Sequence, residues 1–549
     1  MTNELLYLRQ NIQLEPLIDQ WYAWSHLISP ATAARNITER HFKIMDSYIN
    51  APQIHANAVK NPKMLGGPFI DYDGKRVDEI RALRDRTRRD RAHLVALSTA
   101  LAELDGMLRA NAKGYSLHSL YDKVPAMLKG FVELQYDLNN QASYRLIEPL
   151  LYRSRYYDKT TQSLMLSRIS GDDRPFVLST PRLEGDGLLH LKLPFDDPRV
   201  DELFELKKTP RTWSSIRDMF DLSEPQADLF RGFFTEEAPP PYRRYEGDGL
   251  LWRYFGHACI MVETKNVSML FDPVLSYTYE SSISRYTYLD IPDRLDFVLI
   301  THNHQDHILF ETLLQLRNRI GTIIVPRSGS GALEDPSVKL TLENCGFKNV
   351  IELREMESVP IQGGSITGLP FFGEHSDLAI NTKLAYLVRV HGESFLFAAD
   401  SCNIEPALYK HVHNSVGDVR ALFLGMECDG APMSWVYGPL QIQRLERGMD
   451  ESRRLSGSNC EQGMGIVEAF NCREAYVYAM GQEPWLNYVM SLKYTEQSRP
   501  IVDSNRLIET CRSRGMCAER LFGEKEILLE GGAAREQPRI AKVAAPQVN

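Results

Sequence analysis

The chain has 549 residues, 43% of them hydrophobic, and a formal net charge of −9. This length exceeds what one hydrophobic core usually organises, so we expect two or three domains. The balance of 63 basic against 72 acidic residues gives no basic excess, which argues against nucleic acid or an anionic membrane as an obligatory partner.

The N-terminal segment lacks the basic flank and apolar run of a secretory signal. No segment approaches the roughly 20 apolar residues that cross a bilayer. The eight cysteines are scattered, without a CxxC pair or dense spacing, a pattern typical of reduced thiols rather than a disulfide framework or a zinc ribbon. We therefore expect a cytoplasmic protein with no membrane segment.

Residues 1–235 are predicted to form a mainly helical domain. Residues 77–107 carry Leu, Ile and Val at helical spacing, with Arg and Asp on the opposite face. The acids within the arginine-rich run 81–91 favour a solvated helix face or a subunit interface over an RNA contact. A short strand at 188–194 and two helices at 212–220 and 225–234 are compatible with a small α+β, winged-helix-like segment.

Residues 236–248 are predicted to be a linker, because three consecutive prolines can neither continue a helix nor donate to a sheet. Residues 249–530 then show an α/β pattern. Residues 531–549, rich in Ala, Gln, Pro and Lys, are expected to form a flexible tail. The α/β pattern consists of a hairpin from 251–263 and 267–271, further strands at 297–300, 323–325, 385–390, 394–399 and 421–424, and a helix at 309–319.

A cluster of metal-binding residue types directly follows the predicted strand 297–300. The sequence there is Thr-His-Asn-His-Gln-Asp-His, from Thr301 to His307. Alternation in an extended segment places His302 and His304 on one side, and the following turn can bring Asp306 and His307 to a second ion. Burying three histidines and an aspartate without a metal would leave costly unsatisfied polar groups. The segment therefore predicts a two-metal site.

This HxHxDH pattern resembles the metallo-β-lactamase superfamily over about residues 250–530. The segments Gly-His-Ala at His257, Phe-Asp-Pro at Asp272 and Ala-Ala-Asp at Asp400 look like the early hairpin, a strand end and the bridging aspartate of that superfamily. The resemblance implies an αββα sandwich. Asp400 ends a strand, which suits a carboxylate that bridges two ions. We expect His257 to be a hydrogen-bonding strand residue rather than a ligand, and Asp272 to support a ligand from behind.

The sequence departs from the hydrolases of that superfamily at two positions. Their dizinc sites generally use one histidine between the motif and the bridging aspartate and another near the C-terminus, but here no histidine follows His413. At the central position Glu374 immediately precedes His375. Adjacent residues of an extended segment point to opposite faces, so we expect only one to face the metals, and we favour Glu374. Mixed histidine and carboxylate ligands suit iron or manganese better than zinc, and this ligand set favours iron.

The segments THNHQDH, GEHSD, FAADS and GMECDGAP are similar to a narrower family, the metallo-β-lactamase-fold diiron β-hydroxylases of nonribosomal peptide biosynthesis, which includes the β-hydroxylase of chloramphenicol biosynthesis. The resemblance implies an O2-dependent monooxygenase with two Fe ions. Its substrate would be an amino acid tethered as a thioester to a peptidyl carrier protein. Because no GxGxxG follows a predicted strand and no flavin site is recognisable, electrons would come from a separate reductase.

The same resemblance implies roles for individual residues. His302, His304 and Glu374 would bind one iron, and Asp306 and His307 the other. The carboxylates expected to take part in catalysis are Asp400, as the bridge between the irons, Glu374, and Glu427, as a further carboxylate at or near the cluster. The family also implies a homodimer, with carrier-protein contacts from residues 1–235.

Two other functions use the same motif. A dinuclear zinc or manganese hydrolase would employ a bridging hydroxide as nucleophile, but the absent histidines and Glu374 count against it. A scaffold protein with a degenerate metal site is disfavoured by the complete motif together with Asp400. The amino acid side chain that is hydroxylated stays open.

Overall fold

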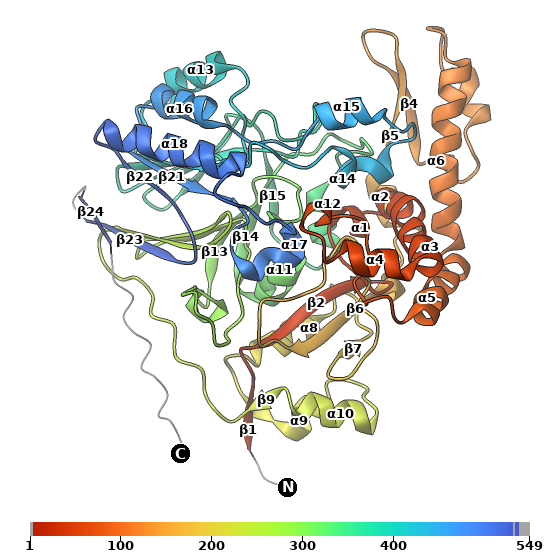
Figure 1. Ribbon diagram of the computed structural model, residues 1–549, viewed down its shortest axis with the longest axis horizontal. Coiled ribbons are helices and arrows are strands. Elements are labelled where there is room, and N and C mark those ends of the chain that lie inside the picture. The colour runs from red at the N-terminus through yellow and green to blue at the C-terminus, as the bar shows by residue number, and fades with distance from the viewer. Residues whose placement is uncertain (1–3, 531–532, 537–549) are drawn as a thin grey trace.

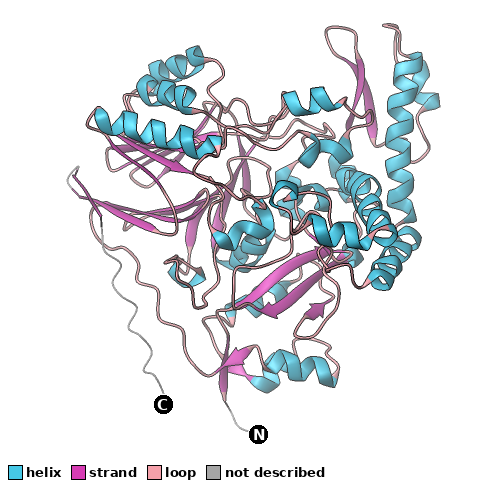
Figure 2. Cartoon of the chain, in the orientation of Figure 1, coloured by secondary structure: helices cyan, strands magenta, loops and turns pink. Residues whose placement is uncertain are grey.

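The structure is a computed structural model that describes residues 4–530 and 533–536. An N-terminal part, rich in helices, lies beside a C-terminal sandwich of two large sheets (Figures 1 and 2). Among the described residues, no helix is long and apolar enough to cross a membrane. The two-part organisation and the α/β class therefore agree with the sequence prediction.

The N-terminal part is mainly helical, as predicted, but it opens on strands. Its central sheet is four-stranded, in the order β3-β2-β6-β7, and antiparallel. The strands are β1 (Leu5–Leu8), β2 (Ile12–Ile18), β3 (Trp21–Tyr22), β4 (Val132–Tyr136), β5 (Ala142–Leu146), β6 (Gln162–Arg168), β7 (Leu189–Leu191), β8 (Arg211–Thr212) and β9 (Phe234–Thr235). The helices are α1 (Ser25–Ile28), α2 (Pro30–Asn36), α3 (Phe42–Asn50), α4 (Pro52–Ala58), α5 (Val77–Asp90), α6 (Ala92–Asn111), α7 (Glu148–Tyr152), α8 (Pro198–Glu205), α9 (Trp213–Arg217) and α10 (Glu224–Arg231).

The helix predicted at 77–107 is two helices, α5 and α6, which break at Arg91. The Arg91 guanidinium lies 2.9 Å from Asp19 and 2.8 Å from Asp158, so two distant acids bind the residue where the chain turns. Periodicity along one segment carries no signal for such a break. The two short helices expected near residues 212–234 are α9 and α10, and the flanking strands β8 and β9 both pair with β1.

The C-terminal part is the predicted αββα sandwich. One sheet has the order β15-β14-β13-β12-β11-β10-β23-β24 and the other β16-β17-β18-β19-β20-β21-β22. The first sheet comprises β10 (Leu250–Gly256), β11 (Cys259–Glu263), β12 (Ser268–Phe271), β13 (Leu295–Leu299), β14 (Ile320–Pro326), β15 (Val350–Leu353), β23 (Lys525–Glu530) and β24 (Ala533–Glu536). The second comprises β16 (Ser358–Ile361), β17 (Gly364–Leu369), β18 (Ala385–Val390), β19 (Glu393–Phe397), β20 (Ala421–Gly425), β21 (Glu474–Tyr478) and β22 (Cys517–Arg520).

Aromatic residues fill the space between the two sheets. Phe397 stacks on Phe271 with ring centroids 3.9 Å apart, and on Phe423 at 4.9 Å. Helices cover the outer faces (Figure 1). They are α11 (Phe310–Leu316) and α12 (Val338–Asn344) beside the first sheet, α13 (Pro406–Val416), α16 (Cys460–Ala469) and α18 (Arg499–Ser513) over the second, and the shorter α14 (Ser434–Tyr437), α15 (Arg447–Ser452) and α17 (Asn487–Met490). One hydrophobic cluster runs from the N-terminal part onto α11, so the two parts share a core.

Two predictions about this part were wrong in detail. The stretch 251–263 is not one strand but β10 and β11, which meet at a turn containing His257. In the tail, Ala533–Glu536 form β24 and pair with β23, so these residues extend the sheet instead of belonging to a flexible segment. The remaining tail residues lie outside the described part of the chain. Residues 236–248, predicted to be a linker, contain no helix or strand.

Candidate metal centre

The motif from Thr301 to His307 follows β13 and precedes α11, at the edge of the first sheet. Asp272, the residue after β12, fixes this segment from behind. Its carboxylate accepts hydrogen bonds from the Thr301 backbone N–H at 2.7 Å and hydroxyl at 2.6 Å, and it lies 2.8 Å from Nδ1 of His307. Asp272 therefore turns Nε2 of His307 toward the centre of the cluster, the supporting role proposed from the sequence.

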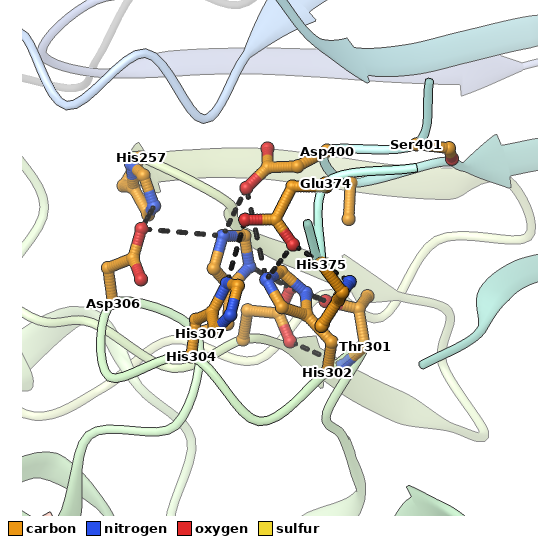
Figure 3. A network of polar contacts seen from close by, with 12 residues as sticks. His257, Thr301, His302, His304, Asp306, His307, Glu374, His375, Asp400 and Ser401 are labelled. Atoms are coloured by element: carbon orange, nitrogen blue, oxygen red, sulfur yellow. Dashed lines mark hydrogen bonds and ion pairs between the residues drawn. The ribbon is translucent and has the colours of Figure 1, made fainter. Parts of the chain in front are cut away.

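One group of potential ligands forms around His302 and His304 (Figure 3). Nδ1 of His304 lies 2.8 Å from Oε1 of Glu374, and Nε2 of His302 lies 3.7 Å from Oε2 of the same carboxylate. Asp400 closes the group, with Oδ2 3.9 Å from Nε2 of His302. Two imidazole nitrogens and two carboxylates therefore converge on one point, although they come from segments about 70 to 100 residues apart.

A second group forms around His307 and shares Asp400 with the first (Figure 3). Nε2 of His307 lies 3.0 Å from Oδ2 of Asp400 and 3.6 Å from Oδ2 of Asp306. Because the same Asp400 oxygen faces His302 and His307, its carboxylate is placed between the two groups. This is the position that a bridging ligand requires.

His257 was expected to lie in a strand, but the structure places it in a turn. It lies in the turn between β10 and β11, with a positive φ of 51°, rather than within a strand. Its Nε2 is 3.0 Å from Oδ2 of Asp306, and His257, Asp306 and His307 together could hold an ion. The expected hydrogen-bonding role is seen, but its partner is a candidate ligand.

The segment around Glu374 and His375 is not extended, so the reasoning that only one of them can face the metals fails. Gly373, Glu374 and Ser376 all have positive φ, and both Glu374 and His375 lie close enough to His302 and His304 to hold an ion together with them. The distances still distinguish them. The Glu374 carboxylate approaches His302 and His304. His375 stacks on His304 with ring centroids 4.6 Å apart, turns Nδ1 toward the Gly373 carbonyl and Glu374, and leaves Nε2 buried without a partner among the described residues.

Glu427 follows β20 and lines the cavity in front of the cluster together with Asp306, Glu374 and Asp400. Burial raises the Glu427 pKa well above its ordinary value, and the charges of Asp400, Asp306 and Glu374 raise it further. Within the described chain, the compact groups able to hold an ion do not include Glu427. It is therefore a carboxylate beside the cluster, with the Tyr494 phenol as a neighbour.

The electrostatics are those of a site that requires cations. Burial raises the pKa of Glu374 to about 7, and Asp400 and Asp306 add to this although His304 opposes it. Burial lowers the pKa of His302 well below its usual value, and the neighbouring histidines lower it further. Metal ions would offset the cost of burying the charged carboxylates, because they neutralise them. They also bind imidazole in its neutral form, which is the form that burial favours for His302.

Unpartnered atoms show that the residues fit a metal pair. Nε2 of His302, Oε2 of Glu374 and Oδ1 of Asp400 are buried without a hydrogen-bond partner in the described part of the chain. Buried polar atoms normally have partners, and two of these three, Nε2 of His302 and Oε2 of Glu374, lie 3.7 Å apart within the cluster. The donor set is mixed imidazole and carboxylate, which suits iron or manganese.

Several residues around the cluster had no specific role assigned from the sequence. The Tyr437 hydroxyl lies 2.9 Å from Nε2 of His304 and so orients that ring, while Thr301 bonds Asp272. A cavity of about 370 Å³ faces the metal-binding side chains. Its apolar walls include Trp24, Val489 and Met490. Tyr437 and Trp24 are far from the motif in sequence, and only the aromatic content after Asp400 offered a weak signal.

Comparison with known proteins decides between iron and zinc chemistry. Residues 7–239 match the diiron non-heme β-hydroxylase N-terminal domain, and residues 268–434 match the β-lactamase superfamily domain. The chain is 41% identical, over 95% of its length and 99% of the relative, to the 4-amino-L-phenylalanyl-[CmlP-peptidyl-carrier-protein] 3-hydroxylase of Streptomyces venezuelae. The chain belongs to the diiron β-hydroxylase family.

The crystal structure of CmlA, a diiron β-hydroxylase from Streptomyces venezuelae, superposes with a TM-score of 0.91 and 39% identity, covering 96% of this chain and 100% of CmlA. A metal-dependent hydrolase of Methanopyrus kandleri is 28% identical over only 27% of this chain and 60% of that protein. The chain is thus an oxygenase with a diiron cofactor, and the hydrolase alternative is not favoured.

Asp272 offers a test of the cluster that leaves its candidate ligands in place. We expect Asp272→Asn to weaken metal affinity by about 10- to 100-fold, because the neutral amide has one acceptor oxygen where both oxygens of the carboxylate accept, from Thr301 and His307. Competition with a chelator measures this affinity. Asp335→Asn is the matched control, since Asp335 is as buried and accepts backbone hydrogen bonds from Gly329 and Asn381. Equal metal affinity in both variants would contradict the role of Asp272.

Proposed function

We propose that this enzyme hydroxylates the β-carbon of an amino acid held as a thioester on the peptidyl carrier protein of a nonribosomal peptide synthetase. The observation that carries the proposal is the 41% identity, over nearly the whole of both chains, to an enzyme whose name specifies a carrier-bound aminoacyl group. The cavity of about 370 Å³ in front of the cluster supports it, because it offers space for an aminoacyl group beside the candidate ligands.

We further propose that His302, His304 and Glu374 hold one iron and that Asp306 and His307 hold the other. Asp400 would bridge the pair, and Glu427 would supply a further carboxylate. The diiron cofactor supplies the activation of O2. One oxygen atom enters the Cβ–H bond, and the other leaves as water after uptake of two electrons and two protons from an external donor.

The chain's own contribution is to position the substrate and to exclude water. Trp24, Val489 and Met490 give the cavity apolar walls, which limits side reactions with solvent. Tyr437 and Asp272 fix the orientation of His304 and His307, so the ligands are preorganised. A preorganised site reorganises little during the reaction.

Mass spectrometry of loaded carrier proteins tests the substrate. Candidate carriers bearing different amino acids are incubated with the reduced enzyme and isotopically labelled O2. We expect one of them to gain a single labelled oxygen atom on the aminoacyl group. If the free amino acid gains the labelled oxygen atom and its carrier-bound form does not, the proposal is contradicted. Metal analysis of protein purified without added metal is the companion measurement, with iron expected and zinc contrary to the assignment.

Three further features are proposed from the family resemblance and the sequence pattern. They are a homodimer, a separate reductase as electron donor, and a cytoplasmic location. The charged outer face of α5, where Arg84 and Arg88 each lie 2.8 Å from Asp46, supports a solvated surface or a subunit contact. Sedimentation equilibrium at several concentrations tests the dimer.

A further inference from the structure

Two hollows meet at the mouth of the metal-facing cavity. The cavity itself is lined at its outer end by Lys63, Leu65 and Gly66 from the N-terminal part. A second hollow of about 460 Å³, here called the outer hollow, shares Leu65 and Gly66 with it, together with Ser491 and Leu492 from the catalytic part. The outer hollow therefore adjoins the metal-facing cavity at these four shared residues.

The rim between these hollows is held in a defined shape at Gly66. The Gly66 N–H donates to the Ser491 hydroxyl at 2.8 Å, and the Trp435 indole N–H donates to the Gly66 carbonyl at 2.8 Å. Gly66 has a φ of +71°, and an added Cβ would meet Nε1 of Trp435 at 3.2 Å. A glycine fits here because both the backbone angle and the close indole disfavour a side chain. The rim is thus preformed.

Two lysine side chains at this mouth are available to bind an anionic ligand. Lys63, on the cavity rim, and Lys493, in the outer hollow, are exposed, and neither ammonium has an ion-pair partner within the described residues. Asp71 is the one acid among the lining residues of the outer hollow. Polar side chains for hydrogen bonding, such as Gln482 and Asn487, line the same hollow.

A third hollow near Gly66 is less suited to an anion, although it contains more basic residues. Its Arg40 donates to the Trp435 carbonyl at 2.6 Å, and Arg35 donates to the Pro439 carbonyl at 3.1 Å. Its Lys43 pairs with Glu39. These three cations already have partners in the protein, so binding a further anion there would compete with existing contacts. Arg444, the fourth basic residue of this hollow, is exposed and has no ion pair among the described residues, so only one of its four cations is available to an anion.

We propose that the outer hollow and the Gly66 rim form the entry port for the phosphopantetheine arm of the loaded carrier protein, an inference that rests on the proposed function. Lys63 and Lys493 supply positive charge for the phosphate of the arm. Gln482 and Asn487 offer partners to its amide groups. The thioester end then passes Gly66 into the metal-facing cavity, where the β-carbon meets the cluster.

Two small probes that differ only in the phosphate test the port. They are the phenylalanyl thioesters of 4′-phosphopantetheine and of pantetheine, with binding to the iron-loaded enzyme measured by calorimetry. Because the aminoacyl group is the same, a poor choice of side chain weakens both probes equally. We expect the phosphorylated probe to bind about tenfold more tightly at low salt, and the difference to shrink as ionic strength rises.

The double variant Lys63→Glu/Lys493→Glu is expected to lose this tenfold preference and to bind the unphosphorylated probe as the wild type does. Lys410→Glu, on the distant helix α13, is the matched control and should keep the preference. A wild type with no preference, or a double variant that keeps it, would overturn the port. Failure of the proposed function is a separate result, namely that no loaded carrier protein gains oxygen.

Discussion

Replacing Glu374 with alanine is expected to reduce hydroxylation by more than about 100-fold and to reduce the iron content, whereas His375→Asn should cost less than about tenfold. The Glu374 carboxylate lies 2.8 Å from Nδ1 of His304 and has a buried oxygen without a hydrogen-bond partner in the described chain. His375 also has a buried Nε2 without a partner among the described residues, but its ring stacks on His304 and its Nδ1 lies 3.1 Å from Glu374 itself. Under the proposed assignment, loss of Glu374 removes a ligand, and loss of His375 removes packing against a ligand.

Single-turnover rates and iron analysis of the two variants measure this difference. Glu148→Ala is the control for removal of a buried glutamate, because Glu148 accepts a hydrogen bond from the Ser337 backbone N–H and belongs to none of the groups able to hold an ion in the described chain. It should retain its iron. If His375→Asn loses iron while Glu374→Ala keeps it, the imidazole is the ligand and the assignment reverses.

The sequence was sufficient for the part of the site that is local. The four motif residues fall within six positions at the end of a strand, and strand periodicity places them without knowledge of the rest of the fold. Asp400 was picked out by its resemblance to the bridging aspartate of the metallo-β-lactamase superfamily, and its place at the end of a predicted strand agreed with that role. The strand itself, β19, ends at Phe397, three residues before Asp400.

The remainder of the site depends on backbone turns and on long-range packing. Glu374 and Ser376 adopt left-handed backbone angles, so the expectation that adjacent residues point to opposite faces did not apply there. Hydrophobic periodicity does not predict left-handed backbone angles at residues other than glycine. Tyr437 reaches His304 from 133 positions away. The pairing of the N-terminal part with α11 was equally invisible, because single-sequence periodicity contains no information about which element packs on which.

Arg174→Met is expected to lower the free energy of unfolding by about 3–5 kcal/mol, because it leaves the buried Glu311 carboxylate without its ion-pair partner and Glu15 with Arg182 alone. Arg174 lies between Glu15 of β2 and Glu311 of α11, 2.7 Å from the latter, and its guanidinium stands 3.5 Å above the Tyr488 ring. Both carboxylates are about 1% exposed. The Arg174–Glu311 ion pair joins the N-terminal part to α11. Because α11 directly follows the metal-binding motif, this ion pair also supports the cluster.

Urea unfolding followed by tryptophan fluorescence measures the effect, and Arg109→Met is the control, because its exposed pair with Asp105 should contribute less than about 1 kcal/mol.

The pH dependence of the free energy of unfolding gives a second readout. Burial alone would raise the pKa of Glu15, but Arg182 and Arg174 lower it from 4.5 to about 2. The folded pKa is depressed, so this stabilisation is complete above pH 4.5 and is lost as the pH falls toward 2. Arg174→Met should flatten that loss, and an unchanged acid profile would show that Arg182 alone holds the Glu15 carboxylate.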